Sequence, residues 1–235
     1  MFDWIAFDAD DTLWENEEIY LQGREKFLQI LASHDLGETD LEQVDAFEVE
    51  NLKYYGYGVM SFVLSMIEMA IHLTGESIHP KDIQKLLDLA KEMLSAEVEV
   101  FAGVPLLLER LSEKYHLLLI TKGDLFHQQR KLRSSGLTDY FRAVEVVSEK
   151  TQDVYRQIMD RYRIDPDRFL MIGNSLRSDI IPVLKLGGWT IFLSGHLSWS
   201  HEDNPLDEFP QDRFLEVKSI NQVLSSLDKL GKQRD

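Results

Sequence analysis

The 235-residue chain contains no cysteine. Disulfide bonds, thiolate nucleophiles, zinc–cysteine sites and iron–sulfur clusters are therefore excluded. Positive charge is also scarce, because 25 lysines and arginines stand against 41 aspartates and glutamates, a formal net charge of −16. A field of that sign repels phosphodiester backbones, so we expect no nucleic-acid partner. A small anionic substrate remains compatible with this charge where local cations or a metal line its site.

Long hydrophobic runs are absent as well. The longest apolar stretch, residues 59–73, is interrupted by Ser61, Ser65, Glu68 and His72, so we expect no membrane partner. The N-terminus lacks the basic segment and apolar run of a signal peptide, and we expect a cytoplasmic protein. With 44% hydrophobic residues, the chain can still bury a sizeable core.

Short apolar runs recur along the chain and predict β-strands. They lie at 2–7, 116–121, 143–148, 169–174 and 189–194, with a weaker candidate at 214–218. Runs of this kind suit strands that are buried on both faces. Segments of helical periodicity separate them; Asp124 is a plausible N-cap for a helix over 125–134, and Gly136 would end it. This alternation predicts an α/β fold, a doubly wound parallel sheet with a Rossmann-like core.

Residues 14–98 break this rhythm, because their apolar positions have helical period throughout. We predict helices at 17–33, 39–53, 59–73 and 80–95, the second of them opened by a capping box of Thr39 and Glu42. The sequence therefore predicts an all-helical domain at 14–98, inserted into an α/β catalytic domain that comprises residues 1–13 and 99–235.

Polar side chains gather where the predicted strands end, which is where parallel α/β sheets bind ligands. They are Asp8, Asp10 and Thr12 after the first strand, Thr121, Lys122 and Gly123 at the second, Lys150 after the third, and Asn174, Ser175 and Asp179 after the fourth. Oxygen ligands of this kind can hold a divalent cation, and a lysine with backbone N–H groups can neutralise a phosphoryl group.

These residues resemble the motifs of the haloacid dehalogenase superfamily of phosphohydrolases. The first motif is Asp8-Ala9-Asp10-Asp11-Thr12; Thr121, Lys150 and the run Gly173-Asn174-Ser175 with Asp179 follow as the other three. The motifs occur in the family's order over residues 1–13 and 99–195, and the helical insert looks like that family's cap.

The resemblance implies a phosphatase that acts on a small phosphorylated metabolite. Asp8 would be the nucleophile that forms an aspartyl-phosphate, and Asp10 would be the general acid and then the general base. Thr121 and Gly123 would bind phosphoryl oxygens, and Lys150 would hold Asp8 while offsetting negative charge in the transition state. The namesake dehalogenases lack a carboxylate at the second position, so Asp10 favours phosphate ester chemistry.

The resemblance also implies a Mg²⁺ cofactor bound by Asp8, the main-chain carbonyl of Asp10 and the fourth motif. Within that motif, Asn174 stands where the family usually has aspartate, so either Asn174 binds the metal through its amide oxygen or Asp179 takes a larger part. Lys122 stands where the family often has asparagine, and it would add a cation beside the phosphate.

Two other functions remain open at this point. A phosphomutase would use the same Asp8 and Asp10 but would withhold the phosphoryl group from water. A catalytically weak binding or regulatory protein is the other, suggested by the missing charge at Asn174. The sequence makes no prediction of the oligomeric state.

Overall fold

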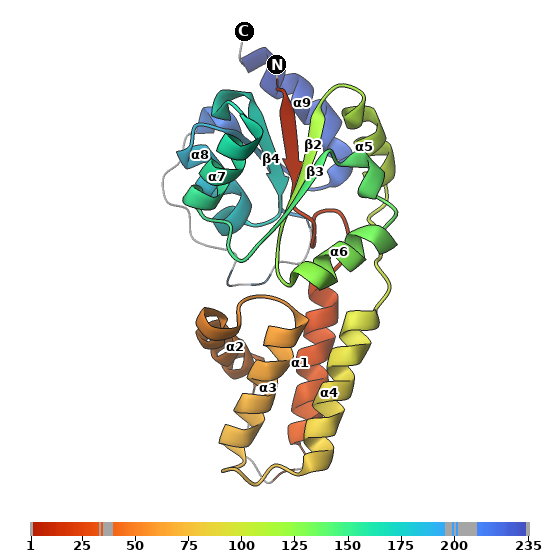
Figure 1. The fold of residues 1–235 in the computed structure, drawn as a ribbon, viewed down its shortest axis with the longest axis vertical. Helices are drawn as coiled ribbons and strands as arrows, with labels where there is room; N and C mark the ends of the chain where they lie inside the picture. The colour runs from red at the N-terminus through yellow and green to blue at the C-terminus, as the bar shows by residue number, and fades with distance from the viewer. Residues whose placement is uncertain are drawn as a thin grey trace. The chain divides into compact units, whose positions relative to one another are not determined.

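The computed structural model describes residues 2–32, 34, 40–195, 199, 201 and 211–233 (Figure 1). The chain divides into two compact units, one formed by Met1–Glu17 with Val98–Asp235 and the other by Glu18–Glu97. Residues 14–17 and 98, which the sequence predicts to be part of the insert, lie in the first unit. We call the first the sheet unit and the second the helical unit.

The sheet unit is built on six parallel strands in the order β3-β2-β1-β4-β5-β6. The strands are β1 (Trp4–Phe7), β2 (His116–Lys122), β3 (Ala143–Val147), β4 (Phe169–Gly173), β5 (Trp189–Leu193) and β6 (Phe214–Val217). The Rossmann-like doubly wound sheet is therefore confirmed, the weaker sixth strand included. The strand order reverses between β1 and β4, and the carboxyl ends of these two strands flank the crevice in which such sheets bind ligands.

The alternation of side chains along the strands builds two cores, one on each face of the sheet. In β1, Ile5 and Phe7 belong to one core, whereas Trp4 and Ala6 belong to the other. Helices cover both faces (Figure 1): α5 and α9 pack on the first, and α7 and α8 lie on the second. β3 departs from the prediction of burial on both faces, because it is an edge strand and all five of its residues remain partly or fully exposed.

Among the described residues, the sheet unit has five α-helices. They are α5 (Val104–Ser112), α6 (Leu125–Ser134), α7 (Gln152–Tyr162), α8 (Ile181–Lys185) and α9 (Val223–Gln233), with short 3-10 turns η1 (Thr138–Tyr140), η2 (Pro166–Arg168), η5 (Gln211–Arg213) and η6 (Ile220–Gln222). Asp124 caps α6 as predicted, since its carboxylate accepts the His127 N–H at 2.8 Å. Gly136, with φ 71°, follows the end of this helix, also as predicted. Before α8 the chain makes a π-helical turn, η3 (Leu176–Ile180), which the sequence did not predict.

In the part of the helical unit that the structure describes, four helices share a core of their own. They are α1 (Glu17–Leu31), α2 (Leu41–Tyr55), α3 (Val59–Leu73) and α4 (Pro80–Ser95). The core is apolar and draws large side chains from α1, α3 and α4, among them Phe27, Phe62 and Leu86. Of the predicted capping box, Thr39 lies outside the described residues; the N-cap of α2 is Asp40, which accepts the Gln43 N–H at 2.9 Å.

One charged residue is buried inside the helical unit. Arg24 of α1 is 3% exposed, and its guanidinium lies 3.0 Å from Asp45 and 3.0 Å from Glu48, both in α2. Glu48 is itself buried. This ion-pair group joins α1 to α2 at a place where either charge alone would be poorly solvated.

The two segments that lead to and from the helical unit pair with each other. Trp14 and Val100 form an antiparallel bridge, Glu15 N–H donates to Glu99 O at 3.0 Å, and Phe101 N–H donates to the carbonyl of Leu13 at 3.0 Å. We call this pairing of residues 13–15 with 99–101 the connecting ribbon.

None of the described helices is by itself long and apolar enough to cross a membrane. The pair α2 and α3 meets the length and composition requirement only when the two are counted together across a 120° bend.

Candidate active site

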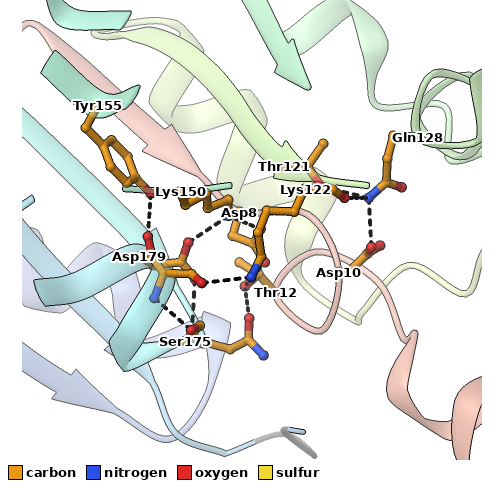
Figure 2. A network of polar contacts seen from close by, with 12 residues as sticks. Asp8, Asp10, Thr12, Thr121, Lys122, Gln128, Lys150, Tyr155, Ser175 and Asp179 are labelled. Carbon is orange, nitrogen blue, oxygen red and sulfur yellow. Dashed lines mark hydrogen bonds and ion pairs between the residues drawn. The ribbon is translucent and has the colours of Figure 1, made fainter. Parts of the chain in front are cut away.

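The side chains of the predicted site lie together at the carboxyl ends of β1, β2 and β4 (Figure 2). Asp8 directly follows β1, and its N–H donates to Ile172 O of β4 at 2.9 Å, so the sheet itself fixes its backbone. Thr121 is the residue before the last in β2, Asn174 follows β4, and Lys150 precedes α7. The structure therefore brings together residues that are up to 166 positions apart, from Asp8 to Asn174.

Lys150 is the centre of a buried ion-pair group. Its ammonium donates to Asp8 Oδ1 and, at 2.7 Å, to Asp179 Oδ1, and the side chains of Lys150 and Asp179 are each 1% exposed. Burial lowers the pKa of Lys150, but the charges of Asp179 and Asp8 outweigh it, so this pKa lies above its usual range. Burial raises the pKa of Asp8 to about 7, while the charge of Lys150 acts in the opposite direction. Two carboxylates thus share one ammonium, and the group carries an excess of negative charge.

Three oxygens face one another beside this group and fit a hard cation. The side-chain oxygen of Asn174 accepts from Thr12 Oγ1 at 3.1 Å. It also lies 3.2 Å from Asp8 Oδ2 and 3.2 Å from the main-chain oxygen of Asp10, neither of which can donate to it. Turning the amide over would instead place its nitrogen as a donor to both. Neighbouring oxygens around octahedral Mg²⁺ are about 2.9 Å apart, so this oxygen corner suits that ion.

Asp179 lies outside the oxygen corner. Its Oδ1 accepts from Lys150, and its Oδ2 accepts the Ser175 N–H at 3.0 Å. Over the described residues, no group of three or more His, Asp or Glu side chains is placed to hold a metal. The corner instead offers one carboxylate, one main-chain carbonyl and one amide, so Asp8, Asp10 and Asn174 are the residues that would hold Mg²⁺.

Thr121 and Lys122 come from the end of β2 and lie beside Asp8 (Figure 2). Thr121 is 2% exposed, and its hydroxyl accepts from Gln128 Nε2 at 2.8 Å. Its own O–H donates at 3.5 Å to the carbonyl of Lys122, a long hydrogen bond that a phosphoryl oxygen could replace. Lys122 donates to Ser178 Oγ of the π turn at 2.9 Å. The cation predicted beside the phosphate therefore bridges β2 and η3.

Gly123, which the sequence predicts to bind a phosphoryl oxygen, takes part in the pairing of two strands. Its N–H donates to Val147 O at 3.3 Å and extends the pairing of β2 with β3. Its φ of 123° is in the region that favours glycine, and the chain turns there from β2 toward α6. Gly123 thus shapes the loop, while its N–H is committed to the sheet.

Asp10 is held by three donors on two oxygens. Trp14 Nε1 donates to Oδ1 at 2.6 Å, Lys131 Nζ donates to the same oxygen, and Gln128 Nε2 donates to Oδ2 at 2.8 Å. Burial raises the pKa of Asp10, but the charge of Lys131 and the three hydrogen bonds outweigh it, so the pKa lies below its usual value. These donors therefore favour the carboxylate form of Asp10.

Gln128 and Lys131 were not identified from the sequence. They lie three positions apart in α6, so they share one side of the helix. The one feature of the sequence that could have pointed to them is the N-cap at Asp124. It fixes where α6 begins and therefore which residues project from each side of this helix. Nothing in their spacing says that this side faces Asp10.

Asp11 shapes the loop that carries the carboxylates. Its φ is 57°, a left-handed conformation that aspartate adopts more readily than most residues. Its carboxylate accepts the N–H groups of Asn16 and Glu17, both at 2.9 Å, and its own N–H donates to Trp14 O at 2.8 Å. Burial raises the pKa of Asp11 to about 7 in spite of these hydrogen bonds. The loop is thereby tied to the start of the connecting ribbon.

This sheet and the carboxylate pair that follows its first strand define a class of hydrolases built on a Rossmann-like core. The family model for haloacid dehalogenase-like hydrolases matches residues 2–187, and the chain belongs to this family. The resemblance of the four motifs is thus confirmed.

Three similar proteins illustrate the range of the family. A glyceraldehyde 3-phosphate phosphatase of Pyrococcus abyssi is 24% identical over 197 residues, which cover 80% of this chain and 79% of that relative. A haloacid dehalogenase-like family hydrolase from Xanthomonas campestris has 39% identity and a TM-score of 0.86, over 99% of this chain and 93% of the other. The HAD-hydrolase YfnB from Bacillus subtilis, bound to magnesium, shares the fold at 15% identity and a TM-score of 0.67, over 97% and 99% of the chains.

Proposed function

We propose that this chain is a Mg²⁺-dependent phosphatase that hydrolyses a small phosphorylated metabolite through an aspartyl-phosphate on Asp8. The observation that carries the proposal is the position of Asp8. One of its oxygens accepts from Lys150, and the other belongs to the oxygen corner with Asn174 and the Asp10 carbonyl. The phosphatase named among the relatives supports the same reaction.

The first step transfers the phosphoryl group to the enzyme. A carboxylate oxygen of Asp8 attacks phosphorus, and the bond from phosphorus to the ester oxygen breaks. The leaving alkoxide takes a proton from the carboxyl group of Asp10. The Thr121 hydroxyl donates to a phosphoryl oxygen, and the ammonium of Lys150 offsets the charge that builds up there.

The second step returns the enzyme to its starting state. Water attacks phosphorus of the aspartyl-phosphate and gives a proton to Asp10, which is now a carboxylate. The bond between phosphorus and the Asp8 oxygen breaks, and inorganic phosphate is released. Mg²⁺ bound at the oxygen corner would supply the positive charge that lets a phosphate approach these carboxylates.

We propose further that the helical unit is a cap domain of the kind that the family resemblance implies. Both of its connections run through the connecting ribbon, whose Trp14 donates to Asp10. In this proposal the cap domain would exclude water from the reacting groups.

The nucleophile is tested by Asp8→Asn. An amide does not attack phosphorus, so hydrolysis of p-nitrophenyl phosphate with Mg²⁺ should fall below a few per cent of the parent rate. Asp3→Asn is the matched control, because Asp3 is a half-exposed carboxylate at the opposite end of β1. Activity that survives in Asp8→Asn would exclude the aspartyl-phosphate mechanism, and phosphoryl transfer to a second sugar without phosphate release would indicate a mutase.

A further inference from the structure

Gln128 of α6 is a buried polar residue that takes no direct part in the proposed reaction. It is 5% exposed, and it lies beside Thr121 and Asp10 (Figure 2). Its amide nitrogen, Nε2, donates to Thr121 Oγ1 at 2.8 Å, to the Lys122 carbonyl at 2.6 Å and to Asp10 Oδ2 at 2.8 Å. One amide thus contacts the hydroxyl that would bind the phosphoryl group and the main chain next to it.

The orientation of the Gln128 amide is fixed by the Lys122 carbonyl. A carbonyl oxygen has no proton to donate, so a hydrogen bond to it at 2.6 Å requires the amide nitrogen at this position. The amide oxygen, Oε1, is buried and accepts no hydrogen bond from the described residues. Turning the amide over would set Oε1 against that carbonyl, so the nitrogen stays beside Thr121.

This orientation decides where the proton of the Thr121 hydroxyl points. The two protons on Nε2 serve three acceptors, and an amide nitrogen does not accept, so Thr121 turns a lone pair toward Gln128 and its proton away. Among the described residues, this proton reaches one acceptor, the Lys122 carbonyl at 3.5 Å, well beyond the usual O–H···O length of about 2.8 Å. Gln128 already donates to that carbonyl at 2.6 Å. The protein therefore holds the Thr121 proton only weakly.

We propose that Gln128 is a positioning residue that presents the Thr121 proton to the phosphoryl group. The inference rests on the proposed phosphatase function, because it needs a phosphoryl oxygen beside Thr121. The amide occupies one lone pair of the hydroxyl and also occupies the Lys122 carbonyl, which is the alternative acceptor for the proton. A donor that is already turned toward the reacting group needs no reorganisation during the reaction. Without the amide, the hydroxyl would donate to the carbonyl, and a substrate would first have to break that bond.

The amide is tested by Gln128→Met, which keeps the length of the side chain and removes both donors. With p-nitrophenyl phosphate and Mg²⁺, kcat/KM should fall by about 3- to 10-fold, the range of one neutral hydrogen bond. p-Nitrophenolate leaves without a proton from Asp10, and kcat/KM covers only the steps up to its release, so the contact with Asp10 adds little to this loss. Gln129→Met is the matched control, because Gln129 is the next residue in α6 and is exposed; its kcat/KM should stay unchanged.

The route through Thr121 is tested by a double-mutant cycle. Thr121→Val removes the hydroxyl and keeps nearly the same shape. In this background Gln128→Met should change kcat/KM by less than about twofold, because no proton is left to present. A purely structural role of Gln128 would carry its full loss into this background. Gln128→Asn, whose amide is one carbon too short to reach Thr121, repeats the cycle if Gln128→Met fails to fold.

Binding of orthovanadate gives the same cycle where Thr121→Val is too slow to assay. Orthovanadate is an analogue of the phosphoryl group under attack, and its dissociation constant from the Mg²⁺-loaded protein is measured by calorimetry. Gln128→Met should raise this constant by about 3- to 10-fold in the parent and by less than about twofold in Thr121→Val. Equal increases in both backgrounds would overturn the role of Gln128.

Failure of this inference and failure of the proposed function give different results. A parent that hydrolyses p-nitrophenyl phosphate while Gln128→Met loses nothing overturns the role of Gln128, and the phosphatase stands. Equal losses with and without the Thr121 hydroxyl have the same meaning. A parent that hydrolyses neither p-nitrophenyl phosphate nor alkyl phosphates overturns the proposed function, and the role of Gln128 is rejected with it.

Discussion

Asn174 contributes an oxygen to the corner without contributing charge. Its amide lies 3.2 Å from both Asp8 Oδ2 and the Asp10 carbonyl, so aspartate at this position would add one negative charge at the same distance. Hard divalent cations bind more tightly as the ligand charge rises. We expect Asn174→Asp to lower the dissociation constant of Mg²⁺ by about tenfold and Asn174→Ala to raise it, measured by calorimetry without substrate.

A suitable control for these variants is Asn16→Ala, which removes a contact of Lys131 and leaves the corner intact. Unchanged Mg²⁺ affinity in both Asn174 variants would mean that this residue is only part of a turn. The metal assignment would then pass to Asp179.

The loss of rate on removing the carboxylate of Asp10 should increase with the pKa of the leaving group. We expect Asp10→Asn to slow hydrolysis of alkyl phosphates by about 10²- to 10⁴-fold, the usual contribution of general acid catalysis. The rate with p-nitrophenyl phosphate should fall much less, because p-nitrophenolate leaves without protonation. A linear free-energy plot over esters of graded leaving-group pKa measures this, and equal losses across the series would exclude Asp10 as the acid.

At the level of helices and strands, the local signals in the sequence predicted most of what the structure contains. Alternating faces in β1 and the cap at Asp124 depend on neighbours in the chain, and both could be read directly. The exposure of β3 could not, because an edge position follows from strand order. The π turn η3 was missed for a similar reason, since it places Asp179 on Lys150 across the sheet.

In the candidate site, too, features set by local sequence were predicted, and features set by tertiary packing were missed. Asp8, Asp10, Thr121 and Lys150 stand at strand ends, so one strand pattern and one family resemblance located them. Gln128 and Lys131 were missed because α6 brings them to Asp10 only after it packs on the sheet.

The buried ion-pair group of Arg24 should decide how firmly α1 and α2 hold together. Arg24→Met leaves Glu48 buried without its cation, so we expect the helical unit to lose about 3 kcal/mol of unfolding free energy. Combining it with Glu48→Leu should recover part of that loss, because the double variant removes the buried carboxylate and leaves only Asp45, whose side chain is 29% exposed, without its cation. Urea unfolding followed by circular dichroism gives both values. Equal stability of Arg24→Met and the parent would show that the pairs are not coupled to folding.

At the scale of the whole molecule, the two units have separate cores, so a ligand of one should stabilise that one. Mg²⁺ would bind only in the sheet unit and should stabilise it by about 2.7 kcal/mol at one hundred times its dissociation constant. Hydrogen exchange should therefore slow in β1 and β4 on addition of Mg²⁺, while α3 and α4 keep their rates. Ca²⁺, which prefers longer bonds and more ligands, is the control ion. Equal slowing in α3 and α4 would show that the units unfold together.

The connecting ribbon has a consequence for how such chains diversify. Because Trp14 and Val100 lie opposite each other as bridge partners, a two-residue hairpin turn could close the same gap that residues 18–97 now fill. The entropy of closing a loop grows only slowly with its length, so a long insertion between these points is tolerated almost as well as a short one. The connecting ribbon is therefore a position at which evolution or an engineer can exchange one inserted domain for another. The catalytic residues of the sheet unit would stay the same.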